Sequence, residues 1–357
     1  MAKNPFFTVV MPAYGVEKYL DKAVKSIERQ TFKDWELIIV DDRSADRTGE
    51  IADELQTTDS RIRVIHHAVN KGVSEARNTG IDAGTGKYIW FMDPDDSVDS
   101  ELLSRVYESL DENPAKLVVF GHYEEYYHED GSFAYAHEIR PEKRCFTKPE
   151  EIHSYMIRLE QETIYGYVWN KVYDLVYMKE KNVRYESLAL NEDIVFNIEY
   201  CNDIDTMNLL DITPYHYAKR MEGSLTTKFV SEYYPLHRRR IDMLLAQLQY
   251  WGTDDRQSCA VLGGLYGRYI LSALERNCDK RSGMTLSERR KFCREVFRDP
   301  LFDRLLPVAE ARDSKVLKLV LKCLNSRSVL LGTAMGRAVH VIRNGLPVLY
   351  TKTKSGR

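Results

Sequence analysis

The stretch "KYIWFMDPDDS" (residues 87–97) is an apolar run that ends in a cluster of acids. Asp93, Asp95 and Asp96 fall within four positions, and carboxylates that close repel one another. A cap for the following helix needs only Ser97 or Asp99, so capping leaves these three acids unexplained. Mg²⁺ and Mn²⁺ take carboxylate oxygens and keep other positions for water and substrate phosphates. The stretch therefore predicts a site for a divalent cation and a diphosphate at the end of a buried strand.

Short apolar runs alternate with helical patterns on both sides of this stretch. The expected strands are 6–11, 35–40, 61–66, 87–92 and 116–120, and the expected helices are 17–30, 46–56, 73–84 and 99–113. Near-continuous apolar strands separated by helices are typical of a mostly parallel sheet with helices on both faces. The predicted fold class is therefore α/β.

Polar segments follow four of these strands. They are "PAYG" (12–15), "DDRS" (41–44), "HHAVNKG" (66–72) and "DPDDS" (93–97). In open α/β sheets, ligands bind at the carboxyl ends of the strands, so these four segments predict one site along one edge.

The acids of "DDRS" have two interpretations. Ser44 or Asp46 could cap the helix that follows, but capping does not account for the pair Asp41 and Asp42. An acid after a buried strand can accept hydrogen bonds from a nucleobase or a ribose. We expect ligand contact for Asp42 and a structural role for Asp41. The glycine motifs of dehydrogenases and P-loop enzymes are absent from the sequence.

The regular alternation ends near residue 120. A tyrosine-rich hairpin is expected over 122–140, a short amphipathic helix over 191–201 and an extended segment over 207–220. From about residue 230 the pattern is mainly helical. The predicted domains are therefore 1–228, which carries the site, and 229–357, a helical C-terminal region with a basic amphipathic tail.

Composition limits the possible partners. A net charge of −3 argues against nucleic acid, and six widely spaced cysteines without a CxxC motif favour reduced thiols in the cytoplasm. The first residues lack the pattern of a signal peptide, and no apolar stretch reaches the ~18 residues of a membrane span. Residues 314–357 hold nine Lys or Arg and no Asp or Glu, which favours peripheral contact with an anionic membrane. The alternative is a solvated helix that packs on the protein's own core.

The ordered set of motifs between residues 6 and 120 resembles the catalytic domain of family 2 inverting glycosyltransferases, which have the Rossmann-like GT-A fold. Three later segments resemble the subgroup that builds bacterial surface polysaccharides: "VWNKVYD" (168–174), "NEDIVFN" (191–197) and "YAKRMEGSLTT" (217–227). Residues beyond 230 add nothing to the resemblance.

This resemblance implies a donor site. It assigns Pro12, Ala13 and Tyr14 to the nucleobase pocket and Asp42 to a contact with the base, expected to be uracil. It assigns Arg77 to the ribose or phosphates, Asp93 to the edge of the sugar or metal, Asp95 to the ribose or metal, and Asp96 to Mn²⁺ or Mg²⁺. Two positions depart from the family pattern, because Gly15 replaces its usual asparagine and Arg43 replaces its usual glycine.

The resemblance also assigns the general base to Asp193. The local sequence alone favours another role, in which Glu192 and Asp193 complement the helix dipole after a cap at Asn191. His216 as a further metal ligand and Arg220 as a phosphate clamp stay open.

The expected function is metal-dependent, inverting transfer of a sugar from a nucleotide sugar, with UDP as the expected nucleotide. The acceptor would be a hydroxyl of a glycan or lipid-linked carrier at the inner face of the cytoplasmic membrane. The alternative is a non-catalytic subunit on the same fold that binds nucleotide sugars or acts as a scaffold. A pyrophosphorylase is disfavoured, because its glycine-rich N-terminal loop is absent from the sequence.

Overall fold

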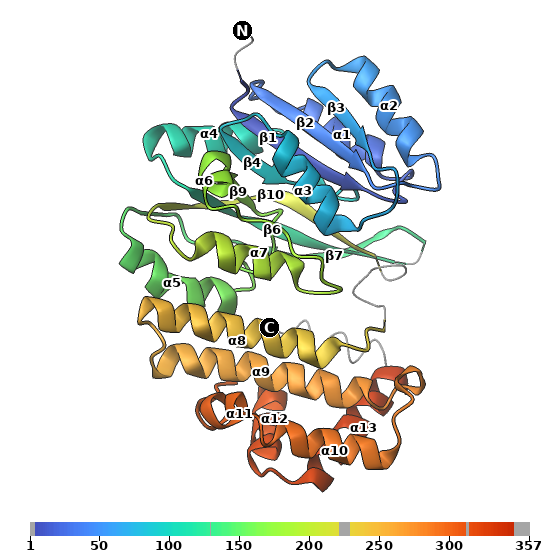
Figure 1. The fold of residues 1–357 in the computed structure, drawn as a ribbon, viewed down its shortest axis with the longest axis vertical. Coiled ribbons are helices and arrows are strands. Elements are labelled where there is room, and N and C mark those ends of the chain that lie inside the picture. The colour runs from blue at the N-terminus through green and yellow to red at the C-terminus, as the bar shows by residue number, and fades with distance from the viewer. Residues whose placement is uncertain (1–3, 129, 221–228, 312–313, 346–357) are drawn as a thin grey trace. The chain divides into compact units, whose positions relative to one another are not determined.

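The computed structural model describes residues 4–128, 130–220, 229–311 and 314–345, and the chain divides into two compact units (Figure 1). The first unit is Met1–Thr227 and the second is Lys228–Arg357. Part of the predicted motif at 217–227 and the end of the basic tail, 346–357, lie outside the described residues.

A ten-stranded mixed sheet forms the centre of the first unit, with strand order β3-β2-β1-β4-β9-β6-β10-β5; β7 pairs with β6 and β8 with β10. The strands are β1 (Phe7–Ala13), β2 (Trp35–Asp41), β3 (Ile62–His66), β4 (Tyr88–Phe91), β5 (Ser97–Val98), β6 (Leu117–Tyr127), β7 (Phe133–Ile139), β8 (Arg144–Phe146), β9 (Lys171–Asp174) and β10 (Met207–Arg220). Strands β1 to β4 pair in parallel, as do β6 and β10. Strand β9 lies antiparallel between β4 and β6, an insertion that the sequence analysis did not predict.

Helices cover both faces of this sheet, as predicted. They are α1 (Leu20–Glu28), α2 (Thr48–Thr58), α3 (Val73–Ala83), α4 (Leu102–Glu112), α5 (Pro149–Gln161), α6 (Leu175–Glu180) and α7 (Glu192–Cys201). Successive side chains of a strand point to opposite faces. Accordingly, Leu37 and Ile39 of β2 belong to the same core cluster as Leu20 of α1, whereas Ile38 and Val40 pack with Ala76 of α3. The α/β prediction is confirmed.

Two boundaries differ from the predictions. The strand expected to end at residue 120 continues to Tyr127, because it is also the first strand of the predicted tyrosine-rich hairpin. The predicted capping of α4 by Ser97 or Asp99 is wrong. Ser97 belongs to β5 and pairs with His216, while the side chain of Asp99 contacts the ring of His216 at 3.2 Å. The helix begins at Leu102 instead.

The second unit is helical over its described residues, which confirms the mainly helical prediction for this region. Its helices are α8 (Tyr233–Trp251), α9 (Arg256–Arg276), η2 (Lys280–Ser282), α10 (Leu286–Val296), α11 (Pro300–Leu305), η3 (Leu306–Val308), α12 (Lys315–Asn325) and α13 (Val329–Gly345). Helix α9 is central, since α8, α11, α12 and α13 all pack against it. Among the helices that the structure describes, none combines the length and apolarity that crossing a membrane requires.

Candidate active site

The carboxyl ends of β1 and β2 lie side by side and carry the first predicted donor residues. Pro12 and Ala13 are the last two residues of β1 and are buried in the sheet. Tyr14 follows them with 57% of its surface exposed. The carbonyl of Ala13 accepts a hydrogen bond from the backbone N–H of Asp42 (2.9 Å), which ties the two strand ends together. Of Pro12, Ala13 and Tyr14, only Tyr14 thus has a side chain that is exposed to solvent.

The carboxylate of Asp42 is 2% exposed and holds the loop after β3 in place. Its Oδ1 lies 2.7 Å from Nδ1 of His67 and accepts the N–H of Lys71, while its Oδ2 accepts the N–H of Gly72. Three of the roughly four acceptor positions of a carboxylate are therefore in use. The predicted contact with a nucleobase stays a prediction, and the structure adds a role in organising the loop.

Asp41 has the structural role expected of it. It accepts the N–H of Ser44 (3.1 Å) and contacts Nδ1 of His66, whose Nε2 contacts Asp53. Hydrogen bonds to Asp53 and Asp41 raise the pKa of His66. From the sequence, "HHAVNKG" was marked only as a polar strand end, and the pairing of its two histidines with Asp41 and Asp42 at the end of β2 was missed.

Arg77 joins three segments that are far apart in the sequence. Its guanidinium, on the buried side of α3, donates to Oδ1 of Asp93 after β4 (3.1 Å) and to Oδ1 of Asp193 at the start of α7 (2.7 Å). Glu192 lies 3.9 Å away, and the guanidinium lies over the ring of Tyr185. Arg77 itself is 3% exposed. The structure thus brings Arg77, Asp93 and Asp193 together.

Asp193 has the electrostatics of a group that titrates near neutrality. Burial raises its pKa to about 7, the charges of Glu192 and Asp93 add to that rise, and Arg77 opposes it. Its side chain keeps 21% of its surface exposed, so solvent or a ligand can reach it. A general base is most effective when its pKa lies near the working pH.

Asp95 and Asp96 are adjacent but point to different partners. Asp95 is the more open, with a side chain 41% exposed and bound to Arg220 through Oδ2 (2.8 Å). Asp96 is 3% exposed, and its oxygens accept from Tyr215 Oη (2.7 Å) and the N–H of Ala218 (2.8 Å). Burial and neighbouring carboxylates raise the pKa of both acids. This segment therefore holds more negative charge than its surroundings compensate.

The two residues left open by the sequence, His216 and Arg220, both contact carboxylates. His216 lies between Glu125 (2.8 Å from Nδ1) and Asp99 (3.2 Å from Nε2), so both ring nitrogens have partners. Arg220 donates to both the side chain and the backbone carbonyl of Asp95. In this arrangement Arg220 neutralises a predicted metal-site acid, and His216 points to Glu125 and Asp99.

Comparison with known proteins gives a family match for part of the first unit. A family model described as Glycosyl transferase family 2 matches residues 8–168. Residues 8–168 thus form a glycosyltransferase family 2 domain, and the residues after 168 lie outside that match. The resemblance found in the sequence is thereby confirmed.

Relatives and solved structures agree with this glycosyltransferase domain. The uncharacterized glycosyltransferase EpsJ of Bacillus subtilis is 35% identical over 223 residues, which are 62% of this chain and 63% of EpsJ. A Campylobacter jejuni GalNAc(5)-diNAcBac-PP-undecaprenol β-1,3-glucosyltransferase is 36% identical over 118 residues, which are 33% of this chain and 38% of that enzyme. The alignments thus span less than two thirds of either relative.

The fold has a solved counterpart. The crystal structure of S. aureus TarS 1–349 in complex with UDP-GlcNAc aligns with a TM-score of 0.62 and 17% identity, over 95% of this chain and 92% of that chain. At this identity the likeness concerns the fold, and it confirms the GT-A-like architecture predicted from the sequence.

The glycosyltransferase family implies a bound Mn²⁺ or Mg²⁺, for which Asp95 and Asp96 are the predicted ligands. Over the described residues, no group of three or more His, Cys, Asp or Glu side chains could hold a metal. Such a group is not required when one or two carboxylates share the ion with a diphosphate and water. Burial raises the pKa of Asp95 and Asp96 most and neighbouring carboxylates raise it further, and a cation would offset the second of these causes. The acids fit this shared mode of binding.

A buried polar network in the first unit links the segments "VWNK" and "NEDIVFN". Lys171 is fully buried, and its ammonium donates to the carbonyls of Ile164 and Tyr167 and to Oδ1 of Asn170, all within 2.8 Å. Asn197 of α7 donates to the carbonyl of Tyr167 as well. The network therefore fixes residues 164–170 against the helix that begins with Glu192 and Asp193. Sequence reasoning missed it, because nothing local marks a lysine as buried.

A stack of two aromatic rings contacts Asp96 through the hydroxyl of Tyr215. Trp169 is 2% exposed and stacks on Tyr215 with ring centroids 4.4 Å apart, and Tyr215 Oη binds Asp96. Trp169 therefore belongs to the core. Tyr215 was not singled out from the sequence.

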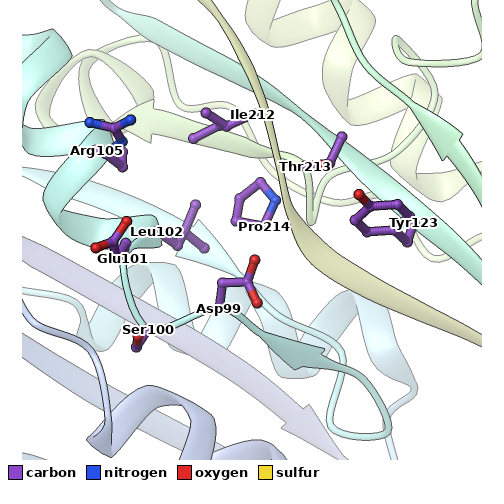
Figure 2. Close-up of a pocket in the computed structure, with 9 residues that line it drawn as sticks. All are labelled: Asp99, Ser100, Glu101, Leu102, Arg105, Tyr123, Ile212, Thr213 and Pro214. Atoms are coloured by element: carbon purple, nitrogen blue, oxygen red, sulfur yellow. The ribbon is translucent and has the colours of Figure 1, made fainter.

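A separate cavity of about 410 Å³ lies between the start of α4 and strands β6 and β10 (Figure 2). Figure 2 shows Glu101 and Arg105 on the α4 side and Thr213 and Tyr123 on the strand side. None of the predicted donor, metal or base residues lines this cavity. The candidate active site is therefore defined by the acids and Arg77 and not by this cavity.

Proposed function

We propose that this protein is a metal-dependent inverting glycosyltransferase that moves a sugar from a UDP-sugar to a hydroxyl of a glycan or lipid-linked acceptor during synthesis of bacterial surface polysaccharide. The observation that carries the proposal is the contact of Arg77 with both Asp93 and Asp193, in a chain whose residues 8–168 match glycosyltransferase family 2. It puts the proposed base beside the acids of the proposed donor site.

The proposed donor contacts follow the strand ends. Tyr14 offers an exposed ring to the nucleobase beside Pro12 and Ala13, and Asp42 has an acceptor position left for the base. Asp93 and Asp95 face the sugar, ribose or metal. Arg77 acts on the donor through the two carboxylates that it holds. TarS, which shares the fold, is seen with UDP-GlcNAc, and this makes UDP-GlcNAc the first donor to test.

The proposed reaction is a single displacement with Asp193 as general base. The acceptor hydroxyl oxygen forms a bond to the anomeric carbon from the face opposite the leaving diphosphate. The bond between that carbon and the diphosphate oxygen breaks, and the UDP leaves with the electron pair. Asp193 takes the hydroxyl proton on Oδ2, because Oδ1 accepts from Arg77. A pKa of about 7 leaves a substantial share of Asp193 ionised at neutral pH.

The proposed cofactor is Mn²⁺ or Mg²⁺, held by Asp95 and Asp96 together with the donor diphosphate. When bound, such an ion would offset the charge that develops on the leaving diphosphate. Arg220, which contacts Asp95, would stay close to the same phosphates. Asp95 is the more exposed of the two acids, so a ligand would reach it first, whereas Asp96 is buried and accepts hydrogen bonds from Tyr215 and Ala218.

The proposed acceptor and location rest on a relative and on charge. The Campylobacter jejuni relative is named for an undecaprenol-linked glycan, which supports a lipid-linked acceptor here. We place the protein in the cytoplasm, at the inner face of the cytoplasmic membrane, with peripheral contact through residues 314–357. Nine Lys or Arg and no Asp or Glu in this segment support that contact.

The experiment that tests the proposal is a screen of UDP-sugars, with UDP-GlcNAc first, for release of UDP in the presence of Mn²⁺ and without an acceptor. Mn²⁺-dependent release of UDP is expected from the wild type and from Asp193→Asn, and an added acceptor should increase it only in the wild type, which separates donor activation from transfer. Binding of UDP-sugars without turnover over a broad panel of donors and acceptors would overturn the proposal in favour of a non-catalytic binding subunit.

A further inference from the structure

We propose that the outward faces of α12 and α13 form a docking surface for an anionic phospholipid membrane. The inference gives the proposed peripheral contact a defined surface, called here the α12–α13 face. It does not depend on glycosyl transfer, because binding to vesicles is measured without a donor.

The orientation of α13 is fixed by its inner side. A Cβ at Gly336 would lie 2.6 Å from the carbonyl oxygen of Leu274, so only glycine lets α13 approach α9 this closely. His340 and Arg343, four and seven residues later, contact the carboxylate of Glu275 on α9. Residues 336, 340 and 343 therefore define the face that α13 turns toward the core.

The opposite side of α13 is apolar and exposed. Leu330 and Val341 are 67% and 61% exposed, and Leu331 and Ile342 about half. Leu330 and Val341 are eleven residues apart, as are Leu331 and Ile342, so each pair shares a stripe of the helix, and Arg337 lies on the stripe of the first pair. A stripe of exposed aliphatic side chains costs free energy in water unless a partner covers it.

Helix α12 supplies the charge. Its buried side packs Leu317, Val320, Leu321 and Leu324 into the second unit. Its outward side carries Lys315, Lys318 and Lys322, and between them Val316 and Leu319 are 60% and 63% exposed. Helices α12 and α13 contact each other and both pack on α9, so their outward sides belong to one surface.

Charge selects the partner. A second copy joined across a twofold axis would bring lysine against lysine on this face, which is repulsive. Exposed aliphatic residues beside lysines, with no acid between residues 314 and 345, match a membrane surface that has anionic phosphates above an apolar interior. The lysines of α12 would lie at the phosphates, and the aliphatic residues of α13 would enter the boundary below them.

The test is flotation of the full chain with vesicles of phosphatidylcholine alone or with phosphatidylglycerol added. The wild type is expected to float only with phosphatidylglycerol. The triple variant Lys315→Gln/Lys318→Gln/Lys322→Gln and the double variant Leu330→Gln/Val341→Gln are each expected to bind about tenfold more weakly or worse. Deleting the segment is unsuitable, because α12 contributes buried leucines to the unit.

Leu286→Gln is the matched control, since Leu286 is a 53% exposed leucine on α10 of the same unit, and its flotation should equal that of the wild type. Circular dichroism identifies any variant that fails to fold, and the lysine variant changes only surface side chains. Equal flotation of all variants would overturn the inference. So would a wild-type dimer that the double variant converts to a monomer without any change in vesicle binding. Loss of vesicle binding with retained UDP release would leave the proposed reaction intact.

Discussion

Nη1 of Arg77 lies 2.7 Å from Oδ1 of Asp193, although 116 residues separate them in the sequence. Asp193 is held there with a pKa raised by burial to about 7, and Arg77 keeps that pKa from rising further. Arg77 thus fixes the position of the proposed base and lowers its pKa from the value that burial alone would give.

Asp193→Asn is expected to keep donor binding and to lose transfer. The amide preserves the shape of the side chain and can still accept from Arg77, but it cannot take a proton. General bases contribute about 10²–10⁴-fold, so the rate of transfer should fall by that factor. Calorimetric binding of the UDP-sugar and single-turnover rates measure the two effects. Glu192→Gln, 3.9 Å from Arg77, is the control and should keep most activity. Undiminished transfer by Asp193→Asn would remove Asp193 from the role of base.

The rate should depend on pH with an inflection near the pKa of Asp193, about 7. Activity requires the carboxylate, so kcat/KM should rise with pH through that range. Arg77 lowers the pKa of Asp193, so Arg77→Lys, which loses the forked geometry, should move the rising limb to higher pH. A profile that stays in place would argue that another group titrates.

The same raised pKa has a consequence for stability. The folded protein binds a proton at Asp193 more tightly than the unfolded chain, whose aspartates titrate near 3.9. This group therefore stabilises the fold below that pH, and its contribution is lost as pH rises toward 7. Urea unfolding of the wild type and Asp193→Asn at several pH values measures the difference, and the variant should show the weaker dependence.

Asp96→Asn is expected to weaken metal-dependent binding of UDP by about tenfold or more while leaving the fold intact. Its amide oxygen can still accept the N–H of Ala218, but it removes a negative charge from the proposed metal site. Titration of UDP with and without Mn²⁺ is the measurement. Asp99→Ala is the comparison, since Asp99 faces His216 and not the proposed site, and it should behave as the wild type. Equal loss in both variants would point to His216 as a participant.

Arg43 lies in the left-handed region with φ 63°, at a position where the family resemblance predicts glycine. That backbone conformation costs a side-chain-bearing residue about 1–2 kcal/mol, and the flexibility of glycine in the unfolded chain offsets about half. Arg43→Gly should therefore be neutral or more stable by up to about 1 kcal/mol. Arg43→Ala keeps a Cβ and should give no such gain. Thermal unfolding of the pair distinguishes backbone strain from loss of the arginine charge.

Lys171→Met is expected to lower both stability and activity. It leaves Oδ1 of buried Asn170 without this donor, at a cost of about 1–3 kcal/mol, while the carbonyls of Ile164 and Tyr167 each keep one bond, from Asn170 and Asn197. The loop that those carbonyls fix also contacts α7, so the transfer rate should fall more than donor affinity. Lys181→Met, at a 48% exposed side chain, should change the free energy of unfolding by less than about 0.5 kcal/mol. Equal effects of the two substitutions would show that the buried network is not needed.

Most of the α/β framework could be predicted because its signal is local. Continuous apolar runs such as "WELIIV" report strands that are covered on both faces, and the acids after β4 stand out at their strand end. Strand β9 escaped prediction because "KVYD" has a lysine and an aspartate in four residues, and the burial of Lys171 depends on acceptors that only the fold supplies.

The site was predictable in part for the same reason. The acids at 93–96 are visible as a cluster, but local sequence gives Asp193 an ordinary role at a helix start, and only the family resemblance marked it. Its contact with Arg77 is a long-range relationship that no spacing rule contains. The roles of His66 and His67 likewise depend on long-range contacts, because each histidine contacts an aspartate 25 residues earlier.

The stack of Trp169 on Tyr215, 4.4 Å between ring centroids, has an optical consequence. Trp90 lies 6.3 Å from the same tyrosine and donates its indole N–H to the carbonyl of Trp169, so two of the four tryptophans surround the ring whose hydroxyl binds Asp96. A change in the charge or hydrogen bonding of Asp96 alters the electric field at both indoles. Binding of a ligand at the acids should therefore change the tryptophan emission spectrum of the native protein, without any added label.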